Sequence, residues 1–165
     1  MMPYPHLFYV AAASLALAAC SSKKDDPTPE PAHSMSWTVD GAAVSTTSLQ
    51  SQKNGTTVSL IGTLNPGSAA NAKVVTLEFP LAVGTYALGP NSVAGFAAYS
   101  TSVGSTPTVY YTGINPNAPT LVGTGTIVVS ALTATNVTGT FTFTGVNTTA
   151  TTSKAITNGT FNVGL

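Results

Sequence analysis

The chain has 165 residues, with five lysines, no arginine and five acidic residues, so its formal net charge at pH 7 is zero. Nucleic-acid binding requires several lysine or arginine side chains on one surface, and electrostatic attachment to anionic lipid requires the same. The composition therefore predicts a protein that has no nucleic-acid partner and does not bind membranes by charge.

Residues 7–19 form an apolar run of thirteen residues that only Ser14 interrupts. A membrane-spanning helix needs about 20 residues, so this length favours the hydrophobic region of a signal peptide. The run ends in Leu17-Ala18-Ala19-Cys20, which resembles the lipobox of bacterial lipoproteins. The resemblance implies a signal peptide at residues 1–19 and membrane anchoring through a diacylglycerol and an acyl chain on Cys20. The alternative is that this run is a first strand or helix of the folded domain.

Charged residues follow the cysteine closely, in the order Lys24, Asp25 and Asp26. This short run resembles the export signal of Bacteroidota lipoproteins that are displayed outside the cell. It implies a lipid-anchored protein of the outer membrane that is exposed at the cell surface, with a periplasm-facing protein as the alternative. If the run is instead a solvated charge cluster, it only keeps the linker away from the membrane.

Residues 20–34 are predicted to be a tether between the anchor and the domain. Within them, residues 26–31 alternate proline with polar residues, which favours an extended polyproline conformation and forbids a helix. At about 3.1 Å per residue the tether reaches roughly 45 Å. His33 lies in this segment and is interpreted as a solvated side chain.

Residues 35–165 show short apolar alternations separated by glycine, asparagine, proline and serine, which is typical of an all-β domain. We expect an antiparallel β-sandwich of roughly eight to ten strands, with a calycin-like β-barrel as the alternative. Residues 123–132, 138–146 and 154–163 are predicted to be three consecutive strands.

Three local patterns predict details of this domain. Met35, Trp37 and Val39 alternate with polar residues, so Trp37 is expected in the core. Asn54-Gly55 predicts a type I′ turn, which would place Leu49 opposite Leu60. Residues 115–119 are rich in asparagine and proline and are predicted to form a long turn.

Further sequence features are shared with a known family. They are Trp37-Thr38-Val39-Asp40-Gly41 at the start of the domain, residues 138–143, and residues 156–163 at its end. This combination resembles a domain of unknown function found in Bacteroidota lipoproteins, and the resemblance covers most of residues 35–165. It implies location and fold, and it brings no catalytic or binding residues with it.

The residue inventory predicts no enzyme, no metal site and no cofactor. A serine or cysteine nucleophile needs a base, but the one cysteine is predicted to carry lipid and His33 lies in the tether. Zinc sites lack ligands for the same reason, and calcium sites lack clustered carboxylates. A glycoside hydrolase, the least favoured alternative, would have to use Asp40 with Glu78.

Binding makes smaller demands on the sequence. Aromatic side chains in the middle third are candidates for a platform that stacks on a sugar ring: Tyr86, Phe96, Tyr99, Tyr110 and Tyr111. Tyr110 and Tyr111 are adjacent and must project to opposite faces of a strand, so one is expected in the core and the other at the surface. The alternative is that all five fill a β core.

Together these patterns predict a non-catalytic ligand-binding or accessory module, with a glycan or an envelope protein as its partner. The alternative is a structural or adhesive envelope protein. Thr140, Thr142 and Thr144 line one face of a predicted strand. These threonines are consistent with an adhesive surface. The alternative is that threonine is simply a favourable neutral residue on the solvent-facing side of a strand.

Overall fold

The computed structural model describes residues 32–104 and 106–165, so the lipobox at Cys20 and the charged run Lys24, Asp25 and Asp26 lie outside the described residues. The described part forms twelve strands and no helix, and accordingly it holds no helix able to span a membrane. The strands are β1 (Ser34–Val39), β2 (Ala42–Thr46), β3 (Leu49–Asn54), β4 (Thr57–Leu64), β5 (Lys73–Pro80), β6 (Gly84–Leu88), β7 (Phe96–Val103), β8 (Thr106–Tyr111), β9 (Gly113–Asn115), β10 (Ala118–Leu132), β11 (Asn136–Val146) and β12 (Ser153–Gly164).

The prediction of an all-β antiparallel fold is confirmed. The strand number exceeds the roughly eight to ten that were expected. One reason is that short strands such as β2 and β9 carry too few alternating residues to be recognised in the sequence. The three predicted C-terminal strands are present as β10, β11 and β12, each longer than expected.

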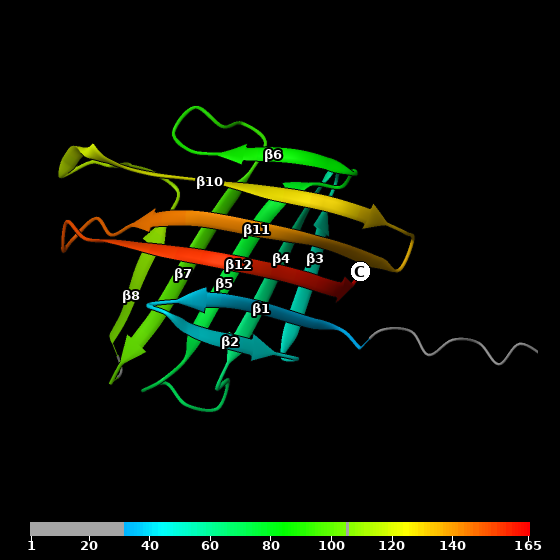
Figure 1. Ribbon diagram of the computed structural model, residues 1–165, viewed down its shortest axis with the longest axis horizontal. Helices are drawn as coiled ribbons and strands as arrows, with labels where there is room; N and C mark the ends of the chain where they lie inside the picture. Colours follow the sequence, from blue (N-terminus) through cyan, green and yellow to red (C-terminus); the bar gives the residue numbers. More distant parts are fainter. Residues whose placement is uncertain (1–31, 105) are drawn as a thin grey trace, which may run out of the picture. The chain divides into compact units, whose positions relative to one another are not determined.

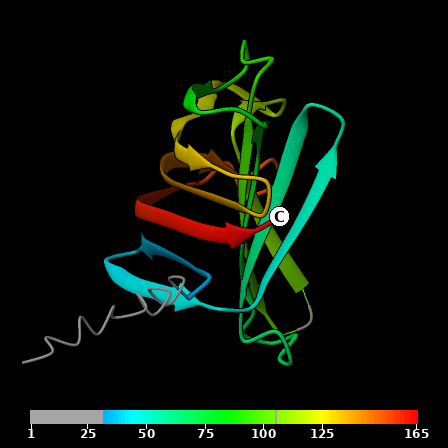
Figure 2. The same cartoon turned by 90° about the vertical axis from the view of Figure 1, so that its right-hand side faces the viewer.

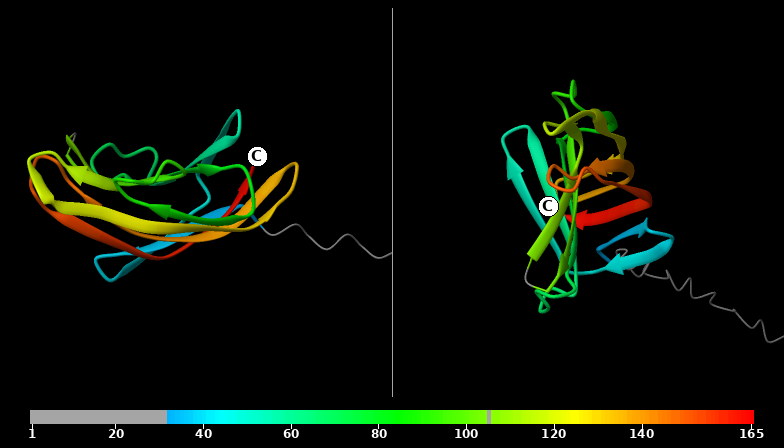
Figure 3. Two further views of the ribbon diagram at one scale, coloured as in Figure 1. Left: turned by 90° about the horizontal axis from the view of Figure 1, so that it is seen from above. Right: turned by 90° about the vertical axis from the view of Figure 1, so that its left-hand side faces the viewer.

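The strands of the β domain form two layers that cross at an angle (Figure 1). The front layer has the order β6-β10-β11-β12-β1-β2, and the rear layer has the order β8-β7-β5-β4-β3. A single pair, Val146 on β11 with Tyr111 on β8, joins the two layers into one sheet path whose ends are β2 and β3. Figures 2 and 3 show the layers edge-on, with the β3–β4 hairpin leaning away from the front layer.

The hydrophobic core lies between the two layers. Met35, Trp37 and Val39 of β1 are at most 2% exposed, which confirms the predicted alternation. Phe79 of the rear layer packs against Phe161 of the front layer, with ring centroids 5.6 Å apart. Fully burying each such side chain contributes about 1.5–3 kcal/mol. The alternation therefore determines which face of each strand points inward.

The β3–β4 hairpin differs from its predicted register. Asn54 pairs with Thr57, so the two-residue loop is Gly55-Thr56, and Gly55 has a positive φ of 61°. Glycine at the first loop position is typical of a type II′ turn, so the predicted type I′ turn at Asn54-Gly55 is wrong. The pairing slides by two residues and places Leu49 opposite Gly62, not Leu60. A slide of two keeps every side chain on its face.

The predicted long turn at residues 115–119 is also wrong, because only Pro116 and Asn117 separate the paired residues Asn115 and Ala118. The side-chain oxygen of Asn115 accepts a hydrogen bond of 2.9 Å from the backbone N–H of Asn117, and this bond holds the turn tight. Asn115 is completely buried, and its amide donates to the carbonyl of Asn147 at 2.7 Å.

Candidate functional site

The five candidate aromatic residues do not form one platform. Tyr99 and Tyr110 are 2% and 8% exposed, and their rings lie 6.4 Å apart in the core. The prediction that they belong to a surface platform is therefore wrong, because the inward faces of β7 and β8 carry them. Tyr111, next to Tyr110, is partly exposed, which confirms that these two residues project to opposite faces. The Tyr111 hydroxyl donates to the carbonyl of Ile114 at 3.3 Å.

Phe96 is the most exposed of the five, with 38% of its surface accessible. It begins β7, where the next residue, Ala97, is buried, so alternation points the Phe96 ring away from the front layer. Its cross-strand neighbour on β5 is Glu78, which is also exposed. An aromatic ring and a carboxylate therefore stand side by side on the outer face of the rear layer.

The pairing extends this arrangement across four strands. Glu78 lies opposite Ser59 on β4, and Ser59 lies opposite Gln52 on β3. We call Phe96, Glu78, Ser59 and Gln52 the outer row. With strands about 4.8 Å apart, the outer row spans roughly 14 Å. It presents a ring, a carboxylate, a hydroxyl and an amide in sequence.

Two hollows lie at the ends of the outer row. The ring hollow, of about 240 Å³, contains Phe96 and Glu78 and is lined by Thr57, Glu78, Ser92, Val93, Ala94, Gly95 and Phe96. The amide hollow, of about 430 Å³, contains Gln52 and Ser59 and is lined by Gln50, Ser51, Gln52, Ser59 and Ile61. Glu78 is the one charged side chain among the residues that line these two hollows.

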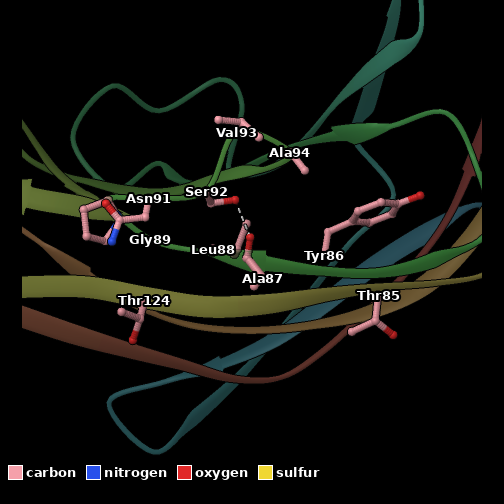
Figure 4. Close-up of a pocket in the computed structure, with 11 residues that line it drawn as sticks. Thr85, Tyr86, Ala87, Leu88, Gly89, Asn91, Ser92, Val93, Ala94 and Thr124 are labelled. Carbon is pink, nitrogen blue, oxygen red and sulfur yellow. Dashed lines mark hydrogen bonds between the residues drawn. The ribbon is translucent and has the colours of Figure 1, made fainter.

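A third hollow, the loop hollow, lies between β6 and the segment that follows it (Figure 4). It has a volume of about 480 Å³ and shares Ser92, Val93 and Ala94 with the ring hollow, so this segment forms a wall between the two. Val93 is fully exposed on that wall. The Ser92 hydroxyl donates to the carbonyl of Ala87 on β6 and fixes the wall against the strand.

Tyr86 lines the loop hollow but is held in place by its own contacts. Its ring stacks on Phe79 with centroids 6.3 Å apart, and its hydroxyl donates to the carbonyl of Ala82 at 2.8 Å. The ring therefore forms a rigid side of the hollow. Of the five predicted aromatic residues, Tyr86 lines the loop hollow and Phe96 lines the ring hollow, and these two hollows share the Ser92–Ala94 wall.

Asp40 and Glu78 belong to different layers of the domain. Asp40 follows β1 in the front layer, in a turn where it and Gly41 both have positive φ. Its carboxylate binds the ammonium group of Lys154 at 2.5 Å. Glu78 belongs to the rear layer and points away from the front layer. A glycosidase needs two carboxyl groups that flank one substrate bond, whereas the Asp40 carboxylate is bound by Lys154.

The ion pair with Asp40 favours the charged form of Lys154. The hydrogen bond to the Asp40 carboxylate raises the pKa of Lys154 above its ordinary value, and partial burial opposes this only in part. The ammonium group also lies 5.8 Å from the ring centroid of Tyr110. Lys154 is therefore a charged structural group, whereas a nucleophilic lysine needs a lowered pKa.

A network of buried amides was not foreseen from the sequence. Asn147 is 7% exposed and donates to the carbonyl of Val109 at 2.8 Å, while its side-chain oxygen accepts from the N–H groups of Thr149 and Ala150. These bonds connect β8 to the β11–β12 connection at the edge where the layers join. A run of asparagine and threonine gives no sequence signal that distinguishes such a network from an exposed loop.

Residues 32–104 and 106–165 contain no group of three or more histidine, cysteine, aspartate or glutamate side chains placed to hold a metal ion. One ring, neutral hydroxyls and amides, and a single carboxylate lie on the outer face of a sheet.

The fold and these surfaces define an all-β antiparallel domain with two open outer faces. A family model described as "Domain of unknown function (DUF6252)" matches residues 38–163, and the chain belongs to this family. No curated protein and no solved structure matches the chain.

Proposed function

We propose that the protein is a non-catalytic carbohydrate-binding module, held at the outer membrane by lipid on Cys20. The observation that carries the proposal is the exposed ring of Phe96 beside Glu78, at one end of the outer row. The ligand is a glycan segment that lies across β7, β5, β4 and β3.

The chemistry of the outer row suits a sugar. A sugar ring presents C–H groups on one face, and these groups suit the electron-rich face of Phe96. Its hydroxyls both donate and accept hydrogen bonds, as do the Ser59 hydroxyl and the Gln52 amide, while the Glu78 carboxylate accepts. Specific sites combine apolar contact with a few placed polar groups in this way.

A glycan array tests this proposal with the full chain purified in detergent. We expect binding to neutral oligosaccharides, and we expect Phe96→Ala to weaken it by roughly tenfold, because loss of an aromatic anchor commonly costs more than about 1 kcal/mol. The matched control is Val103→Ala, which trims another exposed apolar residue on β7 far from the outer row. Equal binding by both variants would remove Phe96 from the site.

The anchor is tested separately in the native cells. We expect mass spectrometry to find a diacylglycerol and an acyl chain on Cys20, and added protease to reach the protein on whole cells. Replacement of Lys24, Asp25 and Asp26 by alanine is expected to retain the lipid and to hide the protein from protease. Unchanged cleavage in this variant would favour the solvated charge cluster over an export signal.

A structural or adhesive envelope protein is the second candidate function. Outward-facing hydroxyls on the front layer favour it, since Thr140, Thr142 and Thr160 are all exposed. Such a protein would bind no glycan on the array, and Phe96→Ala would leave its function in cells unchanged.

A further inference from the structure

The outer face of the front layer contains a fourth hollow, on the opposite side of the domain from the outer row. This hydroxyl hollow has a volume of about 460 Å³ and lies over β10, β11 and β12. Its lining is free of charged side chains and consists of Thr126, Val128, Thr140, Phe141, Thr142, Asn158, Gly159 and Thr160.

A bulge in β12 lies at the hydroxyl hollow and contributes Asn158 and Gly159 to its lining. Phe141 pairs with Gly159 but Phe143 pairs with Ile156, so two residues of β12 oppose one residue of β11. Asn158 in this bulge has a positive φ of 51°, which is uncommon for a residue with a side chain. A Cβ on Gly159 would lie 2.5 Å from the ring of Phe141. The lack of a side chain at Gly159 therefore lets β12 pack closely against Phe141 of β11 on the core side, beneath the hollow.

The polar groups of the hollow are partly fixed by neighbouring residues. The Thr160 hydroxyl lies 2.8 Å from the hydroxyl of Ser36, and the Thr142 hydroxyl donates to the carbonyl of Ile156 at 3.1 Å. The hydroxyls of Thr126 and Thr140 make no hydrogen bond to the described residues. The lining therefore combines fixed groups with two hydroxyls that are available to a ligand. Because the fixed groups are already ordered, they lose little conformational entropy when a ligand binds.

We propose that the hydroxyl hollow is a second ligand site, specific for a neutral sugar. An anion finds no cation in the lining, and a cation finds no carboxylate, so charge selects an uncharged ligand. The hydroxyls both donate and accept hydrogen bonds, as sugar hydroxyls do. Val128 contributes an apolar surface for the C–H face of the ring.

The hydroxyl hollow can bind a ligand whether or not the outer row does. The cross-linking role described next rests on the proposed function, because it needs both sites. The outer row and the hydroxyl hollow are on opposite outer faces, so a domain that uses both holds two glycan segments at once. The module would then cross-link glycan chains at the surface that carries it.

The site is tested by NMR titration of the full chain in detergent with four neutral probes: cellohexaose, xylohexaose, mannohexaose and maltohexaose. We expect at least one probe to shift the amide signals of Thr126, Thr140 and Thr160, in the wild type and in Phe96→Ala alike. The double variant Thr140→Val with Thr160→Val keeps the β-branched shape and removes two hydroxyls. It should weaken this binding about tenfold.

The matched control is Thr144→Val, which lies on the same face of β11 outside the hollow and should bind as the wild type does. Absence of shifts at these threonines with all four probes would overturn the proposal, and so would full binding by the double variant. Shifts at Glu78 and Phe96 without shifts at the threonines would leave the proposed function standing and remove the second site. Shifts at the threonines without shifts at Glu78 and Phe96 would support the second site and contradict the proposed function.

Cross-linking has its own measurement, light scattering of a soluble neutral β-glucan. We expect the wild type to raise the scattering, and we expect neither Phe96→Ala nor the double threonine variant to do so. Binding at both faces without a rise in scattering would overturn the bridging role.

Discussion

Lys154 on β12 donates a hydrogen bond of 2.5 Å to the carboxylate of Asp40, which lies in the turn between β1 and β2. The bond ties the turn to a neighbouring strand, and the ammonium group also faces the ring of Tyr110 in the rear layer. This group of residues therefore connects the two layers at one end of the core, where its contribution to stability depends on pH.

We expect Asp40→Asn to lower the free energy of unfolding at pH 7 by about 0.2–1 kcal/mol, since Asp40 is largely exposed. The pKa of Lys154 is raised in the folded protein, so the contribution of the pair is fully present below the ordinary lysine pKa. It is lost as the pH rises through the raised value. Urea unfolding from pH 7 to strongly alkaline pH measures both effects. The control is Glu78→Gln, which removes a carboxylate that has no ion-pair partner in residues 32–104 and 106–165.

A second pH effect comes from Tyr99. Burial raises the pKa of its phenol above 10.0, so the folded state favours the protonated form. The stability from this protonated phenol is complete below pH 10 and falls as the pH rises toward the raised pKa, because the unfolded chain ionises first. We expect Tyr99→Phe to flatten the alkaline fall in unfolding free energy. An alkaline profile identical to that of the wild type would show that another group causes the fall.

The buried amide network predicts a large effect of Asn147→Ala. The side chain of Asn147 makes three hydrogen bonds to backbone groups, and its removal leaves those groups without their partner. We expect a loss of about 2–3 kcal/mol in unfolding free energy, measured by urea denaturation. Asn71→Ala, in an exposed turn, is the control and should change stability by less than about 0.5 kcal/mol.

The bulge predicts that Gly159 tolerates no side chain. In Gly159→Ala the added Cβ would lie 2.5 Å from both the ring and the backbone oxygen of Phe141. We expect a loss of at least about 1–3 kcal/mol, because the core is already packed there. Gly67→Ala is the control, since its Cβ would meet nothing within 4 Å. The midpoints of thermal unfolding are compared for the two variants. Similar midpoints would contradict the close approach of Gly159 to Phe141.

The fold class and the core could be predicted because strand alternation is a property of the residues themselves. Met35, Trp37 and Val39 show it clearly, and all three are buried. The β3–β4 register was not predictable in the same way, since Asn54-Gly55 and Gly55-Thr56 are both acceptable loops. The choice between them depends on how β4 pairs with β5, which is a long-range contact.

The candidate site was predicted only in part, for a related physical reason. Alternation separates Tyr110 from Tyr111, but it does not tell which face of a strand meets the other layer. Tyr99 and Phe96 therefore looked equivalent in the sequence, although one is buried and the other exposed. The hydroxyl hollow was not predictable, because its lining comes from β10, β11 and β12, whose register is set by long-range pairing. The bulge at Asn158, which has a positive φ, left no signal in the sequence.

The position of β1 in the front layer affects how the domain responds to mechanical force. β1 is paired along its length with β12 on one side and with β2 on the other. A pull along the axis of β1, entering at Ser34, strains both ladders of hydrogen bonds simultaneously, whereas a terminal strand at a sheet edge could be peeled off one bond after another. The carbohydrate-binding role proposed above would benefit from this resistance to shear when a bound polymer is pulled.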